Sequence, residues 1–383
     1  MPSTWIPMRK PSVALLLDSA PRTWTSQEDI HLRLCETLCA QGIKLTLVFA
    51  DQIRADLADR FRESGAAIEI ANYGEGPFRF LKRLRAIVTE HDISLIHVCF
   101  FDYFSAVPWL ARLSGAKHIL YEQLNSGELT ATSWKKQLIQ LRGAIATQPA
   151  VKVIAISRFV KEELIKCGVP AGKIIVRRLG VDTNRFFPDS AARKEWATKL
   201  NIGPEEIIVS TVSVLRPFKN PQTIVQACGL LAKRSVPFKL LVAGDGAMLS
   251  DLQKLAVDVG VTDRIHWLGY CADPKSLLQT SDIFVLASTG EAFGLVLAEA
   301  MACGVPVVGS RSGAIPEIVK DGITGLLAPP RDEVSFADAI ERLARNESLR
   351  KEMGTNSLAR VRERFTVGKT AQETIRIYES LWS

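Results

Sequence analysis

The sequence STGEAFGLVLAEAMACGVPVVGSRSGAIPEIVKDGITGLLAPPRD, residues 288–332, decides the fold. It reads as the end of a strand, a turn at Gly290, a helix from about Gly294, and two further strands, PVVGS and GLLAP. Apolar strands separated by helices are typical of a parallel sheet that is covered by helices on both faces. This stretch therefore predicts a doubly wound α/β unit.

The same alternation extends over the rest of the chain. Before residue 190 the expected strands are SVALLLD, IKLTLVFA, AAIEIA, LIHVCF, HILYEQ, KVIAIS and KIIVRRL, and after it come IIVSTVSVL, FKLLVAG, IHWLG and IFVLAS. Helices are expected between the strands, for example over residues 29–41, 78–91, 105–114 and 158–167. The whole chain is therefore predicted to be α/β.

A break near Pro188 separates two domains, because Pro188 and Asp189 interrupt the strand pattern and the next strand begins only at Ile207. We predict a first domain over residues 1–187 and a second over residues 188–365. The helical segment 366–383 has no strand after it, so we expect it to return to the first domain.

The composition is that of an ordinary globular protein. The chain has 383 residues, of which 47% are hydrophobic and 23% charged, which excludes a disordered or coiled-coil protein. No apolar run reaches the roughly 18 to 20 residues that span a bilayer. The first apolar run, after Arg9 and Lys10, is too short for a secretory signal, so a cytoplasmic protein is expected.

The positive charge is concentrated before residue 190, where 25 Lys and Arg residues face 19 Asp and Glu residues. Arg79, Lys82, Arg83 and Arg85 have helical spacing. They form either a solvated helix face or a contact with an anionic acceptor or an anionic membrane, which would place the protein at the inner membrane face. No nucleic-acid-binding motif accompanies the charge, so a nucleic-acid partner is not expected.

The helix that starts near Gly294 predicts a phosphate site. Unpaired N–H groups of Phe293, Gly294 and Leu295 would point to the carboxyl edge of the sheet, where doubly wound folds bind phosphates. Glu291 and Glu299 would accept hydrogen bonds from a sugar and a ribose of the same ligand. Taken alone, an ion pair for Glu299 and a solvated loop position for Glu291 would be the simpler explanation.

Four motifs, in order, resemble those of the retaining nucleotide-sugar glycosyltransferases of family four. They are RRLGVDTNRFFPD before the domain boundary, LLVAGDGAMLSDL, DRIHWLGY, and the stretch quoted first with its two glutamates. The resemblance covers most of the chain. It implies a GT-B fold of two facing Rossmann-like domains with a deep cleft, the first binding a hydroxyl acceptor and the second a nucleoside-diphosphate sugar.

The resemblance also implies that neither a divalent metal nor another cofactor is needed, so a cation must offset the diphosphate charge. Lys219 matches the family's lysine, whereas Val214 stands at the family's arginine position and Arg216 is a candidate to replace it. The cations and the N–H groups at the helix start would bind the leaving diphosphate, and Glu291 would orient the sugar. The resemblance implies that the anomeric configuration of the sugar is retained. Backbone near Tyr270 would contact the base.

The first domain departs from the family pattern. Trp24, Thr25 and Ser26 stand where many relatives have paired glycines, so an altered acceptor surface is expected. Gln123 stands about where many relatives have a histidine near the reacting carbon, and a glutamine can bind a sugar hydroxyl but cannot share a proton. Four histidines are expected to be structural: His31, His97, His118 and His266.

Three alternative functions fit two Rossmann-like domains to different degrees. A hydride-transfer enzyme is disfavoured, because no GxGxxG motif follows a strand. A nucleotide-sugar epimerase and a non-catalytic homologue that binds nucleotide sugars are both compatible with the sequence. The base and sugar of the donor, the acceptor and the oligomeric state are not predicted.

Overall fold

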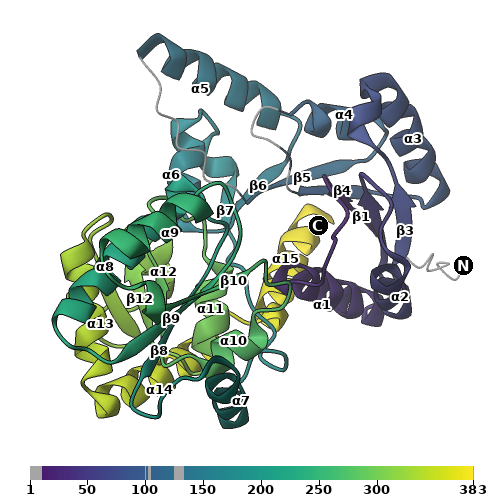
Figure 1. The fold of residues 1–383 in the computed structure, drawn as a ribbon. Coiled ribbons are helices and arrows are strands. Elements are labelled where there is room, and N and C mark those ends of the chain that lie inside the picture. The colour runs from purple at the N-terminus through teal and green to yellow at the C-terminus, as the bar shows by residue number, and fades with distance from the viewer. Residues whose placement is uncertain (1–10, 100, 102–104, 125–132, 383) are drawn as a thin grey trace, which may run out of the picture. The chain divides into compact units, whose positions relative to one another are not determined.

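The computed structural model describes residues 11–99, 101, 105–124 and 133–382, with the backbone alone for 133–136. Arg9 and Lys10 lie outside the described residues. The chain divides into two units (Figure 1). The first contains residues up to Ile156, Val160–Arg177 and the chain from Ala371, and the second contains Ser157–Phe159 and Arg178–Thr370.

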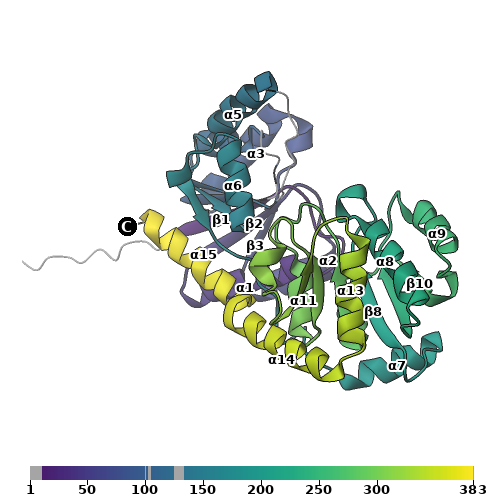
Figure 2. The same ribbon diagram turned by 90° about the vertical axis from the view of Figure 1, so that its left-hand side faces the viewer.

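The second unit thus begins at Arg178 and not at residue 188. Residues 178–187 belong to it because Arg178 pairs with Glu317 and because Val181 forms a parallel bridge with Thr366. Helix α15 (Val367–Trp382) is a single helix whose residues from Ala371 onward belong to the first unit (Figure 2).

The first unit is a parallel seven-stranded sheet with the order β3-β2-β1-β4-β5-β6-β7. Helices α1, α2 and α15 cover one face, and α3, α4 and α5 cover the other (Figure 1). The strands are β1 (Ser12–Leu17), β2 (Lys44–Phe49), β3 (Ala67–Ile70), β4 (Leu95–Cys99), β5 (His118–Gln123), β6 (Lys152–Ala155) and β7 (Ile174–Val176). The helices are α1 (Ser26–Ala40), α2 (Ala55–Glu63), α3 (Pro77–Glu90), α4 (Val107–Leu113), α5 (Ser133–Thr147) and α6 (Arg158–Lys166).

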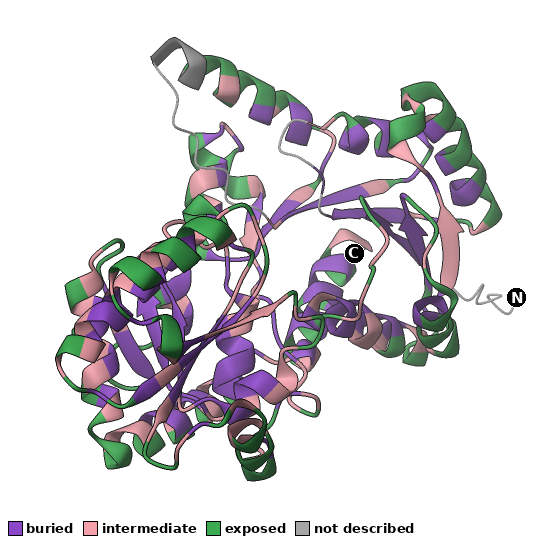
Figure 3. Ribbon diagram, in the orientation of Figure 1, coloured by how far each residue is buried: buried purple, intermediate pink, exposed green. Residues whose placement is uncertain are grey.

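The apolar runs form these strands because both faces of the sheet are covered. All residues of β1 are buried, and Leu15 pairs in register with Leu47 of β2. On one face these residues share a core with Leu34 of α1, Phe61 of α2 and Tyr378 of α15. Figure 3 shows most strands buried, the edge strand β3 intermediate, and the outer faces of the helices exposed.

The second unit is a parallel six-stranded sheet with the order β10-β9-β8-β11-β12-β13. The strands are β8 (Ile207–Val212), β9 (Phe238–Ala243), β10 (Ile265–Gly269), β11 (Ile283–Leu286), β12 (Val307–Ser310) and β13 (Gly325–Ala328). The helices are α7 (Ser190–Leu200), α8 (Pro221–Lys233), α9 (Leu249–Asp258), α10 (Lys275–Thr280), α11 (Leu295–Ala302), α12 (Ile315–Ile318), α13 (Glu333–Ala344) and α14 (Glu347–Arg364).

Two cores hold the second sheet. On one face α8, α9 and α13 pack on the strands, with Phe238, Leu240 and Phe336 fully or almost fully buried. On the other face α7 and α10 pack on Ile208 and Leu241. Each expected strand is therefore present, and the predicted α/β class is confirmed. None of the described helices has the length and apolar character that a bilayer crossing requires.

Candidate active site

Lys219 and Glu291 meet where the strand order of the second sheet reverses. β8 lies between β9 and β11, and Lys219 follows β8 while Glu291 follows β11. Lys219 Nζ donates to Glu291 Oε2 at 2.6 Å, with side chains 19% and 12% exposed. Thr289 N donates to Phe218 O at 2.8 Å, which ties the two loops together. Open α/β sheets bind ligands at such a switch point.

The loop that carries Lys219 is fixed by the Gly-Asp-Gly motif after β9. Leu215 N donates to Asp245 O at 2.9 Å. Gly244 has a φ of 149°, and a Cβ on it would lie 1.8 Å from Ser213 O. Only glycine allows the two backbones to approach so closely. The Gly-Asp-Gly motif therefore holds the backbone of Ser213 and Leu215, in the loop that leads to Lys219.

The backbone of Glu291 is held by the segment that follows β12. Ser312 Oγ donates to Thr289 O at 2.5 Å, and Ala314 N donates to Glu291 O at 2.8 Å. Gly313 has a φ of 57°, and a Cβ on it would lie 2.4 Å from Glu291 O. The segment 312–314 therefore fixes the backbone that carries the Glu291 carboxylate.

Helix α11 begins at Leu295, one residue after its predicted start, and Gly294 caps it with a φ of 97°. In the part of the chain that the structure describes, the N–H groups of Gly294 and Leu295 have no acceptor. The Phe293 ring is buried 6.0 Å from the ring of Phe365, so this residue can offer a ligand only its backbone. Glu299 is buried in the second turn of α11.

The other residues predicted at this edge are exposed. Arg216 precedes the short turn Pro217–Lys219, and its side chain forms no ion pair among the described residues. Val214 is 51% exposed, and Tyr270, directly after β10, is 70% exposed. The structure therefore pairs Lys219, and not Arg216, with Glu291.

In the first unit, a buried polar cluster lies at the ends of β4, β5 and β7. Glu122 pairs with the Arg177 guanidinium and lies 3.1 Å from His97 Nε2, whose other ring nitrogen lies 2.8 Å from the Tyr378 hydroxyl. Burial would raise the pKa of Glu122, but Arg177 and His97 outweigh it and lower the pKa to about 2. His97, Glu122 and Cys99 are close enough to share a metal ion, but the Arg177 charge opposes a cation there.

Gln123 ends β5 beside this cluster. Its side chain is buried, and its Oε1 accepts from the Tyr121 hydroxyl at 2.9 Å. Trp24 is partly buried, and its indole N–H donates to Asp29 at 2.6 Å. Contact of Gln123 and Trp24 with a ligand stays a prediction.

Two family models match the chain. The model of glycosyl transferases group 1 matches residues 192–360, and that of Glycosyltransferase Family 4 matches residues 30–185. The N-acetyl-alpha-D-glucosaminyl L-malate synthase of Bacillus anthracis is 37% identical over 299 residues, which are 77% of each chain. The chain belongs to glycosyltransferase family 4.

The family 4 glycosyltransferase has further relatives. A GDP-mannose-dependent alpha-(1-6)-phosphatidylinositol monomannoside mannosyltransferase of Mycobacterium tuberculosis is 30% identical over 270 residues, which are 68% of this chain and 69% of that protein. A glycosyltransferase structure from Rickettsia africae has a TM-score of 0.81 at 20% identity and covers 98% of this chain and 99% of its own. Anabaena HepE in complex with UDP has a TM-score of 0.80 at 19% identity, with coverage of 96% and 100%. The two Rossmann-like domains therefore have the GT-B fold.

Among the helix starts of the glycosyltransferase, that of α1 differs most from the prediction. Helix α1 begins at Ser26 and not at residue 29, because Thr25 caps it. The Thr25 hydroxyl accepts from a first-turn N–H, and the Glu28 carboxylate accepts from Thr25 N, which is a capping box. The Thr-x-x-Glu signature was visible in the sequence. Thr25, predicted on the acceptor surface, is thus the cap of this helix, and Ser26, its first residue, is buried.

Proposed function

We propose that this glycosyltransferase moves a sugar from a nucleoside-diphosphate sugar to a hydroxyl acceptor, with retention of configuration and without a divalent metal. The Lys219–Glu291 pair at the switch point carries the proposal. An ammonium and the N–H groups of Gly294 and Leu295 suit a diphosphate, and the adjacent carboxylate suits sugar hydroxyls.

The same residues account for the chemistry. Lys219 and the N–H groups at the start of α11 would stabilise the charge on the leaving diphosphate. Glu291, released from Lys219, would accept hydrogen bonds from the sugar. The acceptor oxygen bonds to the anomeric carbon on the face from which the phosphate leaves, and the leaving phosphate oxygen takes the acceptor proton. Lys219 would supply the positive charge that a metal supplies elsewhere.

Two relatives support a nucleotide-sugar donor. The mannosyltransferase of Mycobacterium tuberculosis is named as GDP-mannose-dependent, and HepE has been solved with UDP and with UDP-glucose. Their bases differ, so the base and sugar of this donor need a direct test.

The test begins with a thermal-shift panel of nucleoside diphosphates and nucleotide sugars. A ligand at about 100 times its dissociation constant stabilises the folded protein by roughly 2.7 kcal/mol. We then expect Glu291→Ala to abolish sugar transfer while nucleoside diphosphate binding stays within a few-fold, and Glu299→Ala to weaken nucleotide binding itself. Wild-type transfer by Glu291→Ala would show that the site is assigned wrongly. Conversion of the donor without an acceptor would indicate an epimerase, and binding without turnover a non-catalytic protein.

We also infer that α3 contacts an anionic membrane at its cytoplasmic face. Arg83 pairs with Glu69, but Arg79 and Lys82 are exposed beside Phe78, whose side chain is 88% exposed. An exposed aromatic ring among cations is typical of a helix that lies in the interface of a membrane.

Cosedimentation with vesicles tests this contact. The protein should sediment with vesicles that contain phosphatidylglycerol more than with phosphatidylcholine alone, and Lys82→Glu combined with Phe78→Ser should remove the difference. Lys254→Glu, on an exposed lysine of α9, is the matched control. Equal sedimentation with both vesicle types would refute the contact.

A further inference from the structure

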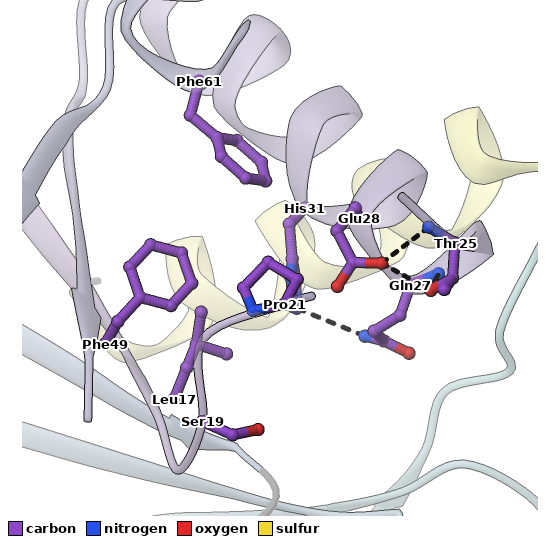
Figure 4. A pocket seen from close by; sticks show the side chains of 9 residues that line it. All are labelled: Leu17, Ser19, Pro21, Thr25, Gln27, Glu28, His31, Phe49 and Phe61. Atoms are coloured by element: carbon purple, nitrogen blue, oxygen red, sulfur yellow. Dashed lines mark hydrogen bonds between the residues drawn. The ribbon is translucent and has the colours of Figure 1, made fainter. Parts of the chain in front are cut away.

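The first unit contains a cavity of about 220 Å³ at the carboxyl ends of β1 and β2, against the first turns of α1 (Figure 4). The strand order of this sheet reverses at β1, which lies between β2 and β4. Ligands of α/β sheets bind beside such a reversal, at the carboxyl ends of the strands. The cavity therefore occupies the position at which this sheet should bind a ligand.

Glu28 presents a carboxylate oxygen to this cavity. The residue is 9% exposed, and both hydrogen bonds from Thr25, from its N–H and from its hydroxyl, end on Oε2. Oε1 points away from Thr25 in Figure 4. Burial raises the pKa of Glu28. A buried acceptor of this kind gains when a ligand donates a hydrogen bond to it.

The remaining lining carries no positive charge. None of the nine lining residues that the structure describes is Lys or Arg. Burial lowers the pKa of His31 to about 4, so its imidazole is neutral at neutral pH, and the Gln27 side-chain nitrogen lies 3.2 Å from its Nε2. A ligand carboxylate or phosphate would therefore lie beside the Glu28 carboxylate without a cationic partner in the lining. Burial of such an unpaired charge is costly.

The apolar walls and the volume of the cavity further restrict the class of ligand that fits it. Phe49 and Phe61 line the side opposite the polar groups of α1 in Figure 4. The volume lies below the roughly 300 Å³ at which pockets for drug-sized ligands begin. The cavity therefore suits one ring-sized group with an apolar face and hydroxyl donors.

We propose that this cavity binds the acceptor and that it selects a neutral, polyhydroxylated ring, such as a sugar or a cyclic polyol, over a carboxylate or phosphate. The inference rests on the proposed function, since it identifies the class of hydroxyl acceptor. It also separates this enzyme from its Bacillus relative, whose name gives L-malate, a dicarboxylate, as the group that receives the sugar.

Ligand-detected NMR tests the cavity without any donor. The probes are methyl glucoside and myo-inositol, each compared with its anionic counterpart, methyl glucuronide and myo-inositol 1-phosphate. With the full chain, saturation transfer is expected to the neutral probes and not to the anionic ones. Ser19→Trp, at an exposed position of the lining, should abolish the signal. Arg22→Trp adds the same ring to the same loop outside the lining and should retain it.

A charge-changing pair tests the selectivity. Gln27→Lys places a cation in the lining, and Gln27→Met is the matched control because it loses the same contact with His31 without adding charge. The affinity ratio of anionic to neutral probe should rise about fivefold in Gln27→Lys relative to Gln27→Met.

Several outcomes would overturn the inference: no binding of either neutral probe, anionic probes that bind wild-type protein as well as neutral ones, binding that survives Ser19→Trp, or equal ratios in the two Gln27 variants. Sugar transfer is measured separately. Intact transfer with no cavity binding would overturn this inference alone, and cavity binding with no turnover of any nucleotide sugar would overturn the proposed function alone.

Discussion

At the scale of single residues, the Lys219–Glu291 ion pair explains how two opposite charges are tolerated in a largely buried site. Each side chain is less than one-fifth exposed, and each neutralises the other across 2.6 Å. Removal of either partner leaves an unpaired charge in a site with little solvent. A ligand that offers both a phosphate and hydroxyls can satisfy the two charges at once.

Lys219→Ala should therefore lower kcat more than it raises the donor KM. The lysine charge matters most while the diphosphate leaves, and removal of one such stabilising group costs about a hundredfold in rate. Steady-state kinetics with the identified donor measures both constants, with Lys233→Ala on α8 as an exposed-lysine control. A raised KM with unchanged kcat would mean that the lysine binds donor and transition state equally.

Gly313→Ala should impair catalysis through the Glu291 backbone. A Cβ at Gly313 would lie 2.4 Å from Glu291 O and 2.6 Å from Glu291 N, so the loop must move. Gly322→Ala is the matched control, because Gly322 also has a positive φ but a Cβ there would meet nothing within 4 Å. We expect a kcat loss of more than about tenfold for Gly313→Ala alone, with nucleoside diphosphate affinity retained. Similar kcat values for the two variants would remove the positioning role.

At the scale of elements, the sequence predicts the strands better than the helix ends. The strands were readable because runs such as SVALLL are buried on both faces and contain no polar interruption. The start of α1 was missed by three residues, because it depends on the Thr25–Glu28 capping box and not on apolar periodicity.

Thr25→Ala should destabilise the protein by about 1 kcal/mol, because the N-terminal N–H groups of α1 lose their side-chain acceptor. Thr37→Ala on the same helix is the control. Thr37 only donates to Arg33 O, four residues earlier, and alanine is the better helix former. Urea unfolding measures both free energies of unfolding. A loss in Thr37→Ala as large as that in Thr25→Ala would contradict the capping role.

At the scale of the whole molecule, the sequence predicts the α/β class and the family but not the pairings inside the site. The Lys219–Glu291 bond joins residues 72 positions apart, and His97 meets Tyr378 across 281 positions. Such pairs follow from strand order, which periodicity does not encode. The sequence showed that Val214 stands at the family's arginine position, but it did not show that Lys219 pairs with Glu291.

Stability should fall in two steps as the solution is acidified. His31 has its pKa lowered from 6.5 to about 4, and Glu122 from 4.5 to about 2, so in both cases the unfolded chain binds protons first. As the pH falls, the free energy of unfolding therefore decreases between pH 6.5 and 4 because of His31, and between pH 4.5 and 2 because of Glu122. Glu28, whose pKa burial raises, acts with the opposite sign.

Urea unfolding at pH 7, 5.5 and 4.5 measures the first of these steps, the one assigned to His31. His31→Gln should flatten the decline between pH 6.5 and 4.5 relative to the wild-type protein, because glutamine does not titrate. Parallel declines in the two proteins would show that His31 is not the group responsible.

The path of α15 has a consequence for the order in which the protein matures during translation. The ribosome makes all of Arg178–Thr370 before it reaches Ala371, yet the core of the first unit needs Ala371, Ile375 and Tyr378. Chains usually complete their domains in the order of synthesis. Here the second unit has its whole core available first, while the nascent first unit has α1 and α2 on this face of its sheet but lacks Ala371, Ile375 and Tyr378 until α15 has been made. During that interval the apolar side chains that α15 covers in the folded protein are open to solvent and to other proteins.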